Sequence, residues 1–149
     1  MADVGSPWTV GRYRGEVTVV SHSEKYWQPD ESWCEERSLD YFPVVFPGFS
    51  WYHLKGGELG QIPRRKGAFL WSQIAEAKRS GSDMIYVAMF DEVDEGTAIF
   101  KCVNNPPSGD GLPFLDYEGL PSDYYLKLVG EAGRLLRGER DLAEGQPEW

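Results

Sequence analysis

Two nearly continuous apolar runs constrain the fold more than any other feature of this sequence. They are YFPVVF at residues 41–46 and MIYVAMF at residues 84–90. Neither run alternates apolar with polar residues, as a half-exposed antiparallel strand does, so each is predicted to be a strand buried on both faces. Strands of that kind occur in parallel sheets that are covered by helices.

Helical patterns fall between and after these two runs. Residues 69–80 place their apolar side chains on one helical stripe, and Gly81 follows where such a helix would end. A second helix is predicted over residues 122–137, with Ser122 as its N-cap. A short acidic helix is expected at residues 29–38.

Two weaker strand predictions complete the pattern, one at residues 3–10, interrupted by Pro7, and one at residues 114–117. The resulting alternation of strands and helices is typical of right-handed βαβ units, so the predicted fold class is α/β with a parallel sheet. No strand is followed by a glycine-rich phosphate-binding fingerprint. The loops after the strands are long and aromatic, which favours a (β/α)8 barrel of the TIM type with its functional loops at the strand ends.

Composition excludes several classes of partner. The chain has 149 residues and a formal net charge of -9, whereas a nucleic-acid-binding protein or an anionic membrane surface calls for a basic face. Cys34 and Cys102 are too few for a disulfide framework or a zinc site, and His22 and His53 share no metal-binding spacing. The first residues carry no signal-peptide pattern, and the sequence does not indicate a compartment.

An acidic cluster follows directly after the run at residues 84–90. It consists of Asp91, Glu92, Asp94 and Glu95. A calcium-binding EF-hand loop is excluded, because its third position is a valine and its twelfth is a cysteine here. Three alternatives stay open: a solvated acidic turn, a metal-dependent hydrolase, which a chelator would inhibit, and a catalytic pair of carboxylates.

The catalytic alternative follows from the position of the cluster. Carboxylates at the carboxyl end of a barrel strand face the mouth of the barrel, where the chemistry of such folds takes place. Two of them three residues apart can converge on one sugar, one as a protonated acid and the other as an ionised base. Glycoside hydrolysis needs such a pair. Trp8, Trp51 and Tyr52 follow predicted strands and are candidates to stack on a sugar ring.

The run FDEVDEGTAIF at residues 90–100 resembles the catalytic segment of glycoside hydrolase family 99 and its 71/99-like relatives, in which Trp-Asn-Glu-Trp-x-Glu-Gly-Thr closes a barrel strand. Glu92 and Glu95 fall on the two glutamates, whereas Phe90, Asp91 and Val93 replace Trp, Asn and Trp. The 71/99-like proteins are also similar to four further segments: residues 6–13, 41–54, 61–71 and 117–139.

The resemblance implies retaining cleavage of an alpha-linked glycan without a metal or organic cofactor. It assigns Glu92 as the base that acts on the 2-hydroxyl of the sugar and Glu95 as the general acid/base. Six residues are predicted to line the sugar site: Trp8, Arg12, Trp51, His53, Arg64 and Asp91. The two arginines are equally compatible with surface ion pairs, and His53 with a hydrogen bond inside a loop.

The length of the chain bears on how much of a barrel it forms. A complete (β/α)8 barrel takes about 250 residues, and this sequence supplies about four strand-helix units. We therefore expect residues 1–139 to form the C-terminal half of a barrel, within a longer enzyme, and residues 140–149 to form a polar tail. A half-barrel exposes sheet edges through which copies could associate. The alternative to an enzyme is a non-catalytic carbohydrate-binding or scaffold remnant of that fold.

Overall fold

The computed structural model describes residues 3–109, 112–143 and 145–148. Its short strands are β1 (Val4–Gly5), β2 (Asp40–Tyr41), β3 (Val44–Val45) and β4 (Tyr86–Val87). Its α-helices are α1 (Glu16–His22), α2 (Gln28–Glu35), α3 (Tyr52–Lys55), α4 (Ala68–Ser80) and α5 (Tyr124–Leu136). A π-helical segment, Ser23–Trp27, joins α1 to α2, and a 3₁₀ turn, Arg65–Gly67, precedes α4.

Both strand pairs are parallel, as predicted. β1 pairs with β2 and β3 pairs with β4, in the register Val4 to Asp40 and Val44 to Tyr86. The extended segment at residues 40–45 therefore lies between β1 on one side and β4 on the other. Apart from an isolated antiparallel bridge between Phe49 and Ile62, the described residues contain only these two short strand pairs and form no closed barrel.

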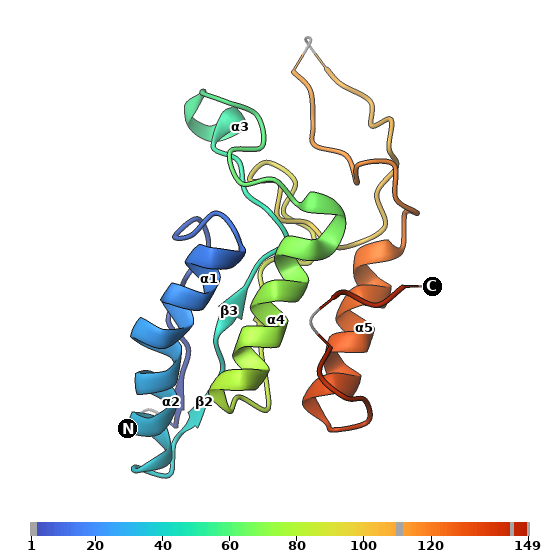
Figure 1. Ribbon diagram of the computed structural model, residues 1–149. Coiled ribbons are helices and arrows are strands. Elements are labelled where there is room, and N and C mark those ends of the chain that lie inside the picture. The colour runs from blue at the N-terminus through green and yellow to red at the C-terminus, as the bar shows by residue number, and fades with distance from the viewer. Residues whose placement is uncertain (1–2, 110–111, 144, 149) are drawn as a thin grey trace.

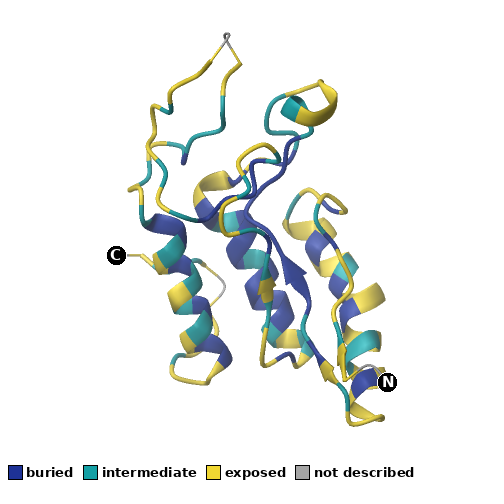
Figure 2. Ribbon diagram, turned by 180° about the vertical axis from the view of Figure 1, so that it is seen from behind, coloured by how far each residue is buried: buried dark blue, intermediate teal, exposed yellow. Residues whose placement is uncertain are grey.

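The helices α1, α2, α4 and α5 lie on one side of the strands, and the other side carries no helix (Figure 1, Figure 2). Between the helices and the strands lies an aromatic core that includes Tyr13, Trp27, Phe46, Phe69 and Trp71. This one-sided cover is the arrangement of βαβ units. Among the described residues, no helix has the length and apolar character needed to cross a bilayer.

The helix predicted at residues 69–80 is confirmed as α4. Gly67 lies just before it with a φ of 93°, and a Cβ there would approach the Tyr124 ring to 2.8 Å. Glycine alone fits both the left-handed backbone and this close approach to α5. The turn therefore fixes how α4 enters the core.

Two helix boundaries differ from prediction. The N-cap of α5 is Asp123 rather than Ser122, and its side chain makes no capping hydrogen bond. The helix expected at residues 29–38 is the end of a helical run that already begins at Glu16. That beginning was missed because its valines are β-branched and do not form one buried stripe; Val17 is 81% exposed.

Three strand predictions need correction. The run at residues 84–90 is not buried on both faces, since the side chain of Tyr86 is 38% exposed on the side without helices. The strand expected at residues 3–10 is reduced to Val4–Gly5. The strand expected at residues 114–117 is wrong, because this segment is a loop whose last residue, Tyr117, is buried.

Candidate active site

The acidic cluster forms a tight loop at the carboxyl end of β4. Glu92 organises this loop: its Oε1 accepts hydrogen bonds from the backbone N–H groups of Asp94 at 2.8 Å and Glu95 at 3.3 Å. Its backbone carbonyl accepts a further bond from the N–H of Thr97 at 3.1 Å. The loop thus folds around one carboxylate and brings Glu95 beside it.

The pKa of Glu95 is raised above the usual value of a glutamate. Burial of its carboxyl is the largest cause, the negative charge of Glu92 is the second, and the positive charge of Lys55 opposes both. Both glutamates are half-buried. A carboxyl with a raised pKa next to another carboxylate is the arrangement that general acid catalysis requires.

The loop after β3 lies against this acidic loop. The backbone N–H of Ser50 donates to the carbonyl of Glu95 at 2.7 Å, and Trp51 follows directly. The Lys55 Nζ lies 3.8 Å from the centroid of the Trp51 ring, and this cation–π contact partly covers the face that was predicted to stack on sugar. Sequence reasoning missed Lys55, although its place one helical turn after Trp51 was a usable signal.

Arg64 supports the acidic loop from the buried side. Its Nη2 donates to the carbonyls of Gly96 at 2.9 Å and Ala98 at 2.6 Å, and its guanidinium lies over the rings of Tyr117 and Tyr125. Only 4% of the residue is exposed. The alternative of a surface ion pair is therefore wrong, whereas contact of Arg64 with sugar stays a prediction.

His53 connects α3 to the loop that contains Pro113 and Phe114. Its Nε2 lies 2.9 Å from the carbonyl oxygen of Pro113, and its ring stacks on Phe114 at a centroid distance of 4.4 Å. The expected hydrogen bond within the loop region is thus present, whereas contact with sugar stays a prediction. Asp91 is exposed beside the glutamates.

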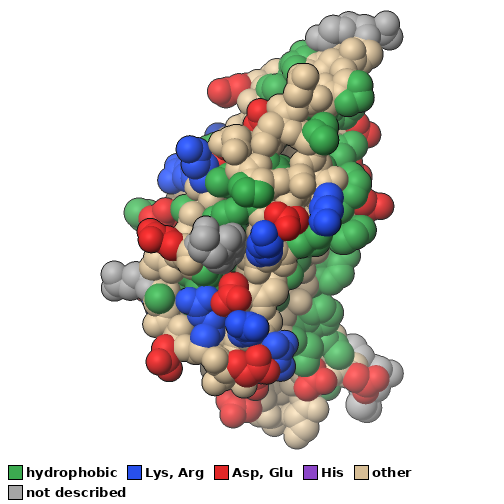
Figure 3. Space-filling model, turned by 90° about the vertical axis from the view of Figure 1, so that its right-hand side faces the viewer, with side chains coloured by type: hydrophobic (Ala, Val, Ile, Leu, Met, Phe, Trp, Pro, Cys, Tyr) green, Lys and Arg blue, Asp and Glu red, His purple; other side chains and the backbone are tan. Residues whose placement is uncertain are grey.

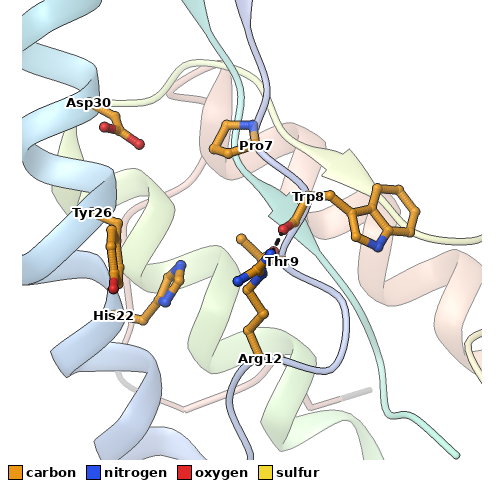
Figure 4. Close-up of a pocket in the computed structure, with 7 residues that line it drawn as sticks. All are labelled: Pro7, Trp8, Thr9, Arg12, His22, Tyr26 and Asp30. Carbon is orange, nitrogen blue, oxygen red and sulfur yellow. Dashed lines mark hydrogen bonds between the residues drawn. The ribbon is translucent and has the colours of Figure 1, made fainter. Parts of the chain in front are cut away.

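Trp8 and Arg12 lie after β1, and the Trp8 ring lies 6.3 Å from the Tyr86 ring of β4. They border a cavity of about 610 Å³, shown in Figure 4, which His22, Tyr26 and Asp30 also line. Arg12 Nε donates to the Trp8 carbonyl at 3.1 Å, while the Trp8 ring points away from His22 and Tyr26. No contact joins Trp8 or Arg12 to the two glutamates within the described part of the chain.

The groups that line this cavity carry opposite charges, and both act on His22. Burial lowers the pKa of His22, the positive charge of Arg12 lowers it further, and the carboxylate of Asp30 opposes both. In the ranges that the structure describes, no group of three or more His, Cys, Asp or Glu side chains is placed to hold a metal ion.

The raised pKa of Glu95 predicts a pH-dependent stability. Folding disfavours the ionised form of Glu95. The contribution of this residue to the stability of the fold is therefore fully present below the pKa of an unfolded glutamate, and it is lost as the pH rises through the pKa in the folded protein. We expect Glu95→Gln to raise the free energy of unfolding at neutral pH and to leave it unchanged in acid. Urea unfolding at several pH values measures this. Asp94→Asn, at an exposed neighbour, is the control; an equal gain in both variants or at all pH values would contradict the assignment.

Comparison with known proteins agrees with the geometry. A family model described as glycosyl hydrolase family 99 matches residues 11–136. Mouse glycoprotein endo-alpha-1,2-mannosidase is 26% identical over 119 residues, which are 79% of this chain and 25% of that protein. The chain therefore spans about a quarter of the length of this curated relative.

Two solved structures of the family 99 endo-alpha-mannosidase from Bacteroides thetaiotaomicron have the same fold. One of them, with bis-tris-propane bound, matches with a TM-score of 0.67 and 25% sequence identity. The matched region covers 80% of this chain and 38% of the Bacteroides chain. The other matches with a TM-score of 0.64 and 24% sequence identity, and the matched region covers 80% of this chain and 34% of the Bacteroides chain. The match of the family model over most of the sequence shows that this chain belongs to glycosyl hydrolase family 99.

Proposed function

We propose that this chain carries the catalytic carboxylates of a retaining glycoside hydrolase that acts on alpha-linked glycans, as part of a longer enzyme. The observation that supports this most is the raised pKa of Glu95 beside Glu92, at the carboxyl end of a parallel strand. Membership of a glycoside hydrolase family agrees with it.

In the proposed reaction the two glutamates have different roles. Glu95, which burial and its neighbour keep protonated to a higher pH, gives its proton to the leaving glycosidic oxygen. Glu92, held in place by two backbone N–H donors, removes the proton of the sugar 2-hydroxyl as this oxygen attacks the anomeric carbon. Water then attacks the anomeric carbon and gives a proton to Glu95, the bond from this carbon to the 2-oxygen breaks, and Glu92 returns its proton to the 2-oxygen, so the configuration is retained.

The substrate is proposed from the relatives. The mouse relative is glycoprotein endo-alpha-1,2-mannosidase, so oligosaccharides with alpha-1,2-linked mannose are the first substrates to test. Phe90, Asp91 and Val93 replace the signature residues next to the pair. Because these positions adjoin the reacting sugar, the panel should also include other alpha-linked hexoses.

The test compares turnover of this panel by the chain and by three variants. We expect Glu92→Gln and Glu95→Gln to abolish turnover and Asp94→Asn to retain it, since Asp94 is exposed and only its backbone N–H contacts the pair. Aryl glycosides with acidic leaving groups should restore part of the activity of Glu95→Gln alone, because such groups depart without a proton. Unchanged turnover in Glu95→Gln would refute the assignment.

A non-catalytic sugar-binding role is the second candidate. It is favoured by how little of a barrel the described residues form, since they contain two short strand pairs and no closed sheet. This candidate predicts that the chain binds an oligosaccharide in calorimetry, that Glu95→Gln binds it equally well, and that neither releases product.

A further inference from the structure

A cavity of about 330 Å³ lies beside the acidic loop, and we call it the Arg64 cavity. Val93 and Gly96 form one part of its wall, and Arg64 and residues between 98 and 117 form the rest. The segment at residues 100–117 rises above α5 in Figure 1. Neither Glu92 nor Glu95 is among the described residues that line this cavity, so it adjoins the candidate active site without being part of it.

The wall of the Arg64 cavity is mostly apolar. Phe100, Phe114 and Tyr117 supply aromatic rings, and the charged residues among the described lining are both cations, Arg64 and Lys101. Figure 3, which views the molecule from the right of Figure 1, shows hydrophobic side chains exposed in the upper part of this side, where the segment at residues 100–117 lies. An apolar cavity with a few charged or polar groups is the usual form of a small-molecule site.

Arg64 is the buried cation of the two, with 4% of the residue exposed. Its Nη2 donates to the carbonyls of Gly96 and Ala98, whereas its Nε and Nη1 are buried and have no hydrogen-bond partner at an acceptable distance and angle among the described residues. The cation–π contacts with Tyr117 and Tyr125 offset only part of the cost of removing this charge from water. Buried donors without a partner therefore indicate that an acceptor is bound there.

Val93 contributes to the size of the cavity. Tryptophan stands at this position in the family 99 signature, whereas this chain has the much smaller valine in the cavity wall. A tryptophan side chain at position 93 would take up part of the space that valine leaves open. The cavity is therefore a feature of this sequence and not of the signature.

We propose that the Arg64 cavity binds an organic anion that carries a carboxylate on a flat apolar body. The carboxylate would lie against Arg64, because a guanidinium and a carboxylate match in both geometry and charge. The flat body would lie among the rings of Phe100 and Phe114. Lys101, which is exposed, would attract the anion toward the cavity. This inference does not rest on the proposed function, and every lining residue lies between positions 64 and 117.

Calorimetric titration with 2-naphthoate tests the proposal. This probe has the required carboxylate and flat body, 2-naphthamide has the same shape without the charge, and acetate has the charge without the body. We expect 2-naphthoate to bind with one molecule per chain. The amide should bind about tenfold more weakly, because hydrogen bonds between charged partners are the stronger ones. Acetate should give no measurable heat at the same concentrations.

Cys102 reports where the probe binds. Its free thiol lines the cavity and is half-buried, whereas the second cysteine of the chain, Cys34, is buried. Alkylation by iodoacetamide, followed by mass spectrometry, should therefore occur first at Cys102. Saturating 2-naphthoate should slow this alkylation markedly, and acetate at the same concentration should leave it unchanged.

Two variants address the body and the charge of the ligand separately. Val93→Trp fills part of the cavity and should weaken binding of both naphthalene probes by about tenfold. Val17→Trp is its matched control, since Val17 is 81% exposed on α1 and lies outside the cavity lining. Lys101→Glu reverses an exposed charge at the cavity and should weaken 2-naphthoate but not 2-naphthamide. Circular dichroism verifies that each variant is folded.

The other outcomes overturn the proposal. Equal affinity for the acid and the amide would show that Arg64 does not hold an anion, and the absence of binding would show that water alone meets its N–H groups. Binding without protection of Cys102 would place the probe elsewhere. Displacement of 2-naphthoate by alpha-1,2-mannobiose would assign the cavity to the sugar site. A longer enzyme that includes this sequence should also bind 2-naphthoate; if only the isolated chain does, another part of the enzyme fills the cavity.

Discussion

Replacement of Arg64 by methionine is expected to lower the free energy of unfolding by about 3 kcal/mol. Hydrogen bonds from a charged donor contribute about 1.5–3 kcal/mol each. Part of the loss is offset, because the variant no longer has to remove a cation from water when it folds. Arg64 Nη2 donates hydrogen bonds to two carbonyls, those of Gly96 and Ala98. Methionine fills a similar volume between Tyr117 and Tyr125 but donates nothing, so both carbonyls lose their charged partner. Urea unfolding measures the difference.

Arg65→Met is the matched control. Arg65 is the adjacent residue and is exposed, and its side chain makes no hydrogen bond or ion pair that the described structure records. An exposed substitution of this kind changes stability by less than about 0.5 kcal/mol. Equal stability losses in the two variants would show that the guanidinium of Arg64 does not support the loop.

The same substitution should also affect the candidate active site. Arg64 holds the backbone directly after Glu95, and burial of Glu95 is the largest cause of its raised pKa. A loosened loop would expose this carboxyl, so its pKa, followed by carboxyl NMR, should fall toward the ordinary value in Arg64→Met. A purely global loss of stability would leave the pKa of the remaining folded molecules unchanged.

The sequence was sufficient for the features that depend on local pattern. The apolar runs at residues 41–46 and 84–90 predicted parallel strands, and the stripe at residues 69–80 predicted α4. The three-residue spacing of Glu92 and Glu95 predicted that their carboxyls approach, and the raised pKa of Glu95 agrees with this. Burial, the larger cause of that shift, depends on packing and could not be read from spacing.

The features that were mispredicted depend on contacts between distant residues. Arg64 is 32 residues from Gly96 and 34 from Ala98, so no local pattern marks it as buried. The exposure of Tyr86 follows from the helices covering one side of the strands only, which a sequence pattern for a complete barrel does not reveal. Local signals thus located the acidic loop, and tertiary contacts determine what supports it.

Replacement of Gln73 by leucine is expected to destabilise the fold by about 4 kcal/mol, because buried polar groups left without partners cost about 1–3 kcal/mol each. Gln73 is buried in α4, and its side-chain amide accepts two hydrogen bonds and donates two. Oε1 accepts from the N–H of Phe46 and the hydroxyl of Tyr13, both at 3.0 Å, while Nε2 donates to the carbonyls of Phe46 at 2.7 Å and Phe69 at 2.9 Å.

The Gln73 side chain forms the backbone hydrogen bonds that a neighbouring strand would otherwise form at the end of β3. The N–H and carbonyl of Phe46 lie just beyond the paired residues, and Gln73 satisfies both of them. Leucine keeps the volume but leaves both Phe46 groups unpaired in an apolar core, and the Tyr13 hydroxyl keeps only its longer bonds to Thr9 Oγ1 and the Val44 carbonyl. Ser72→Ala, which removes only a local bond to the Phe69 carbonyl, is the control and should change stability by less than about 1 kcal/mol. If Gln73→Leu were as stable as this control, the anchoring of the sheet to α4 would have to come from apolar packing alone.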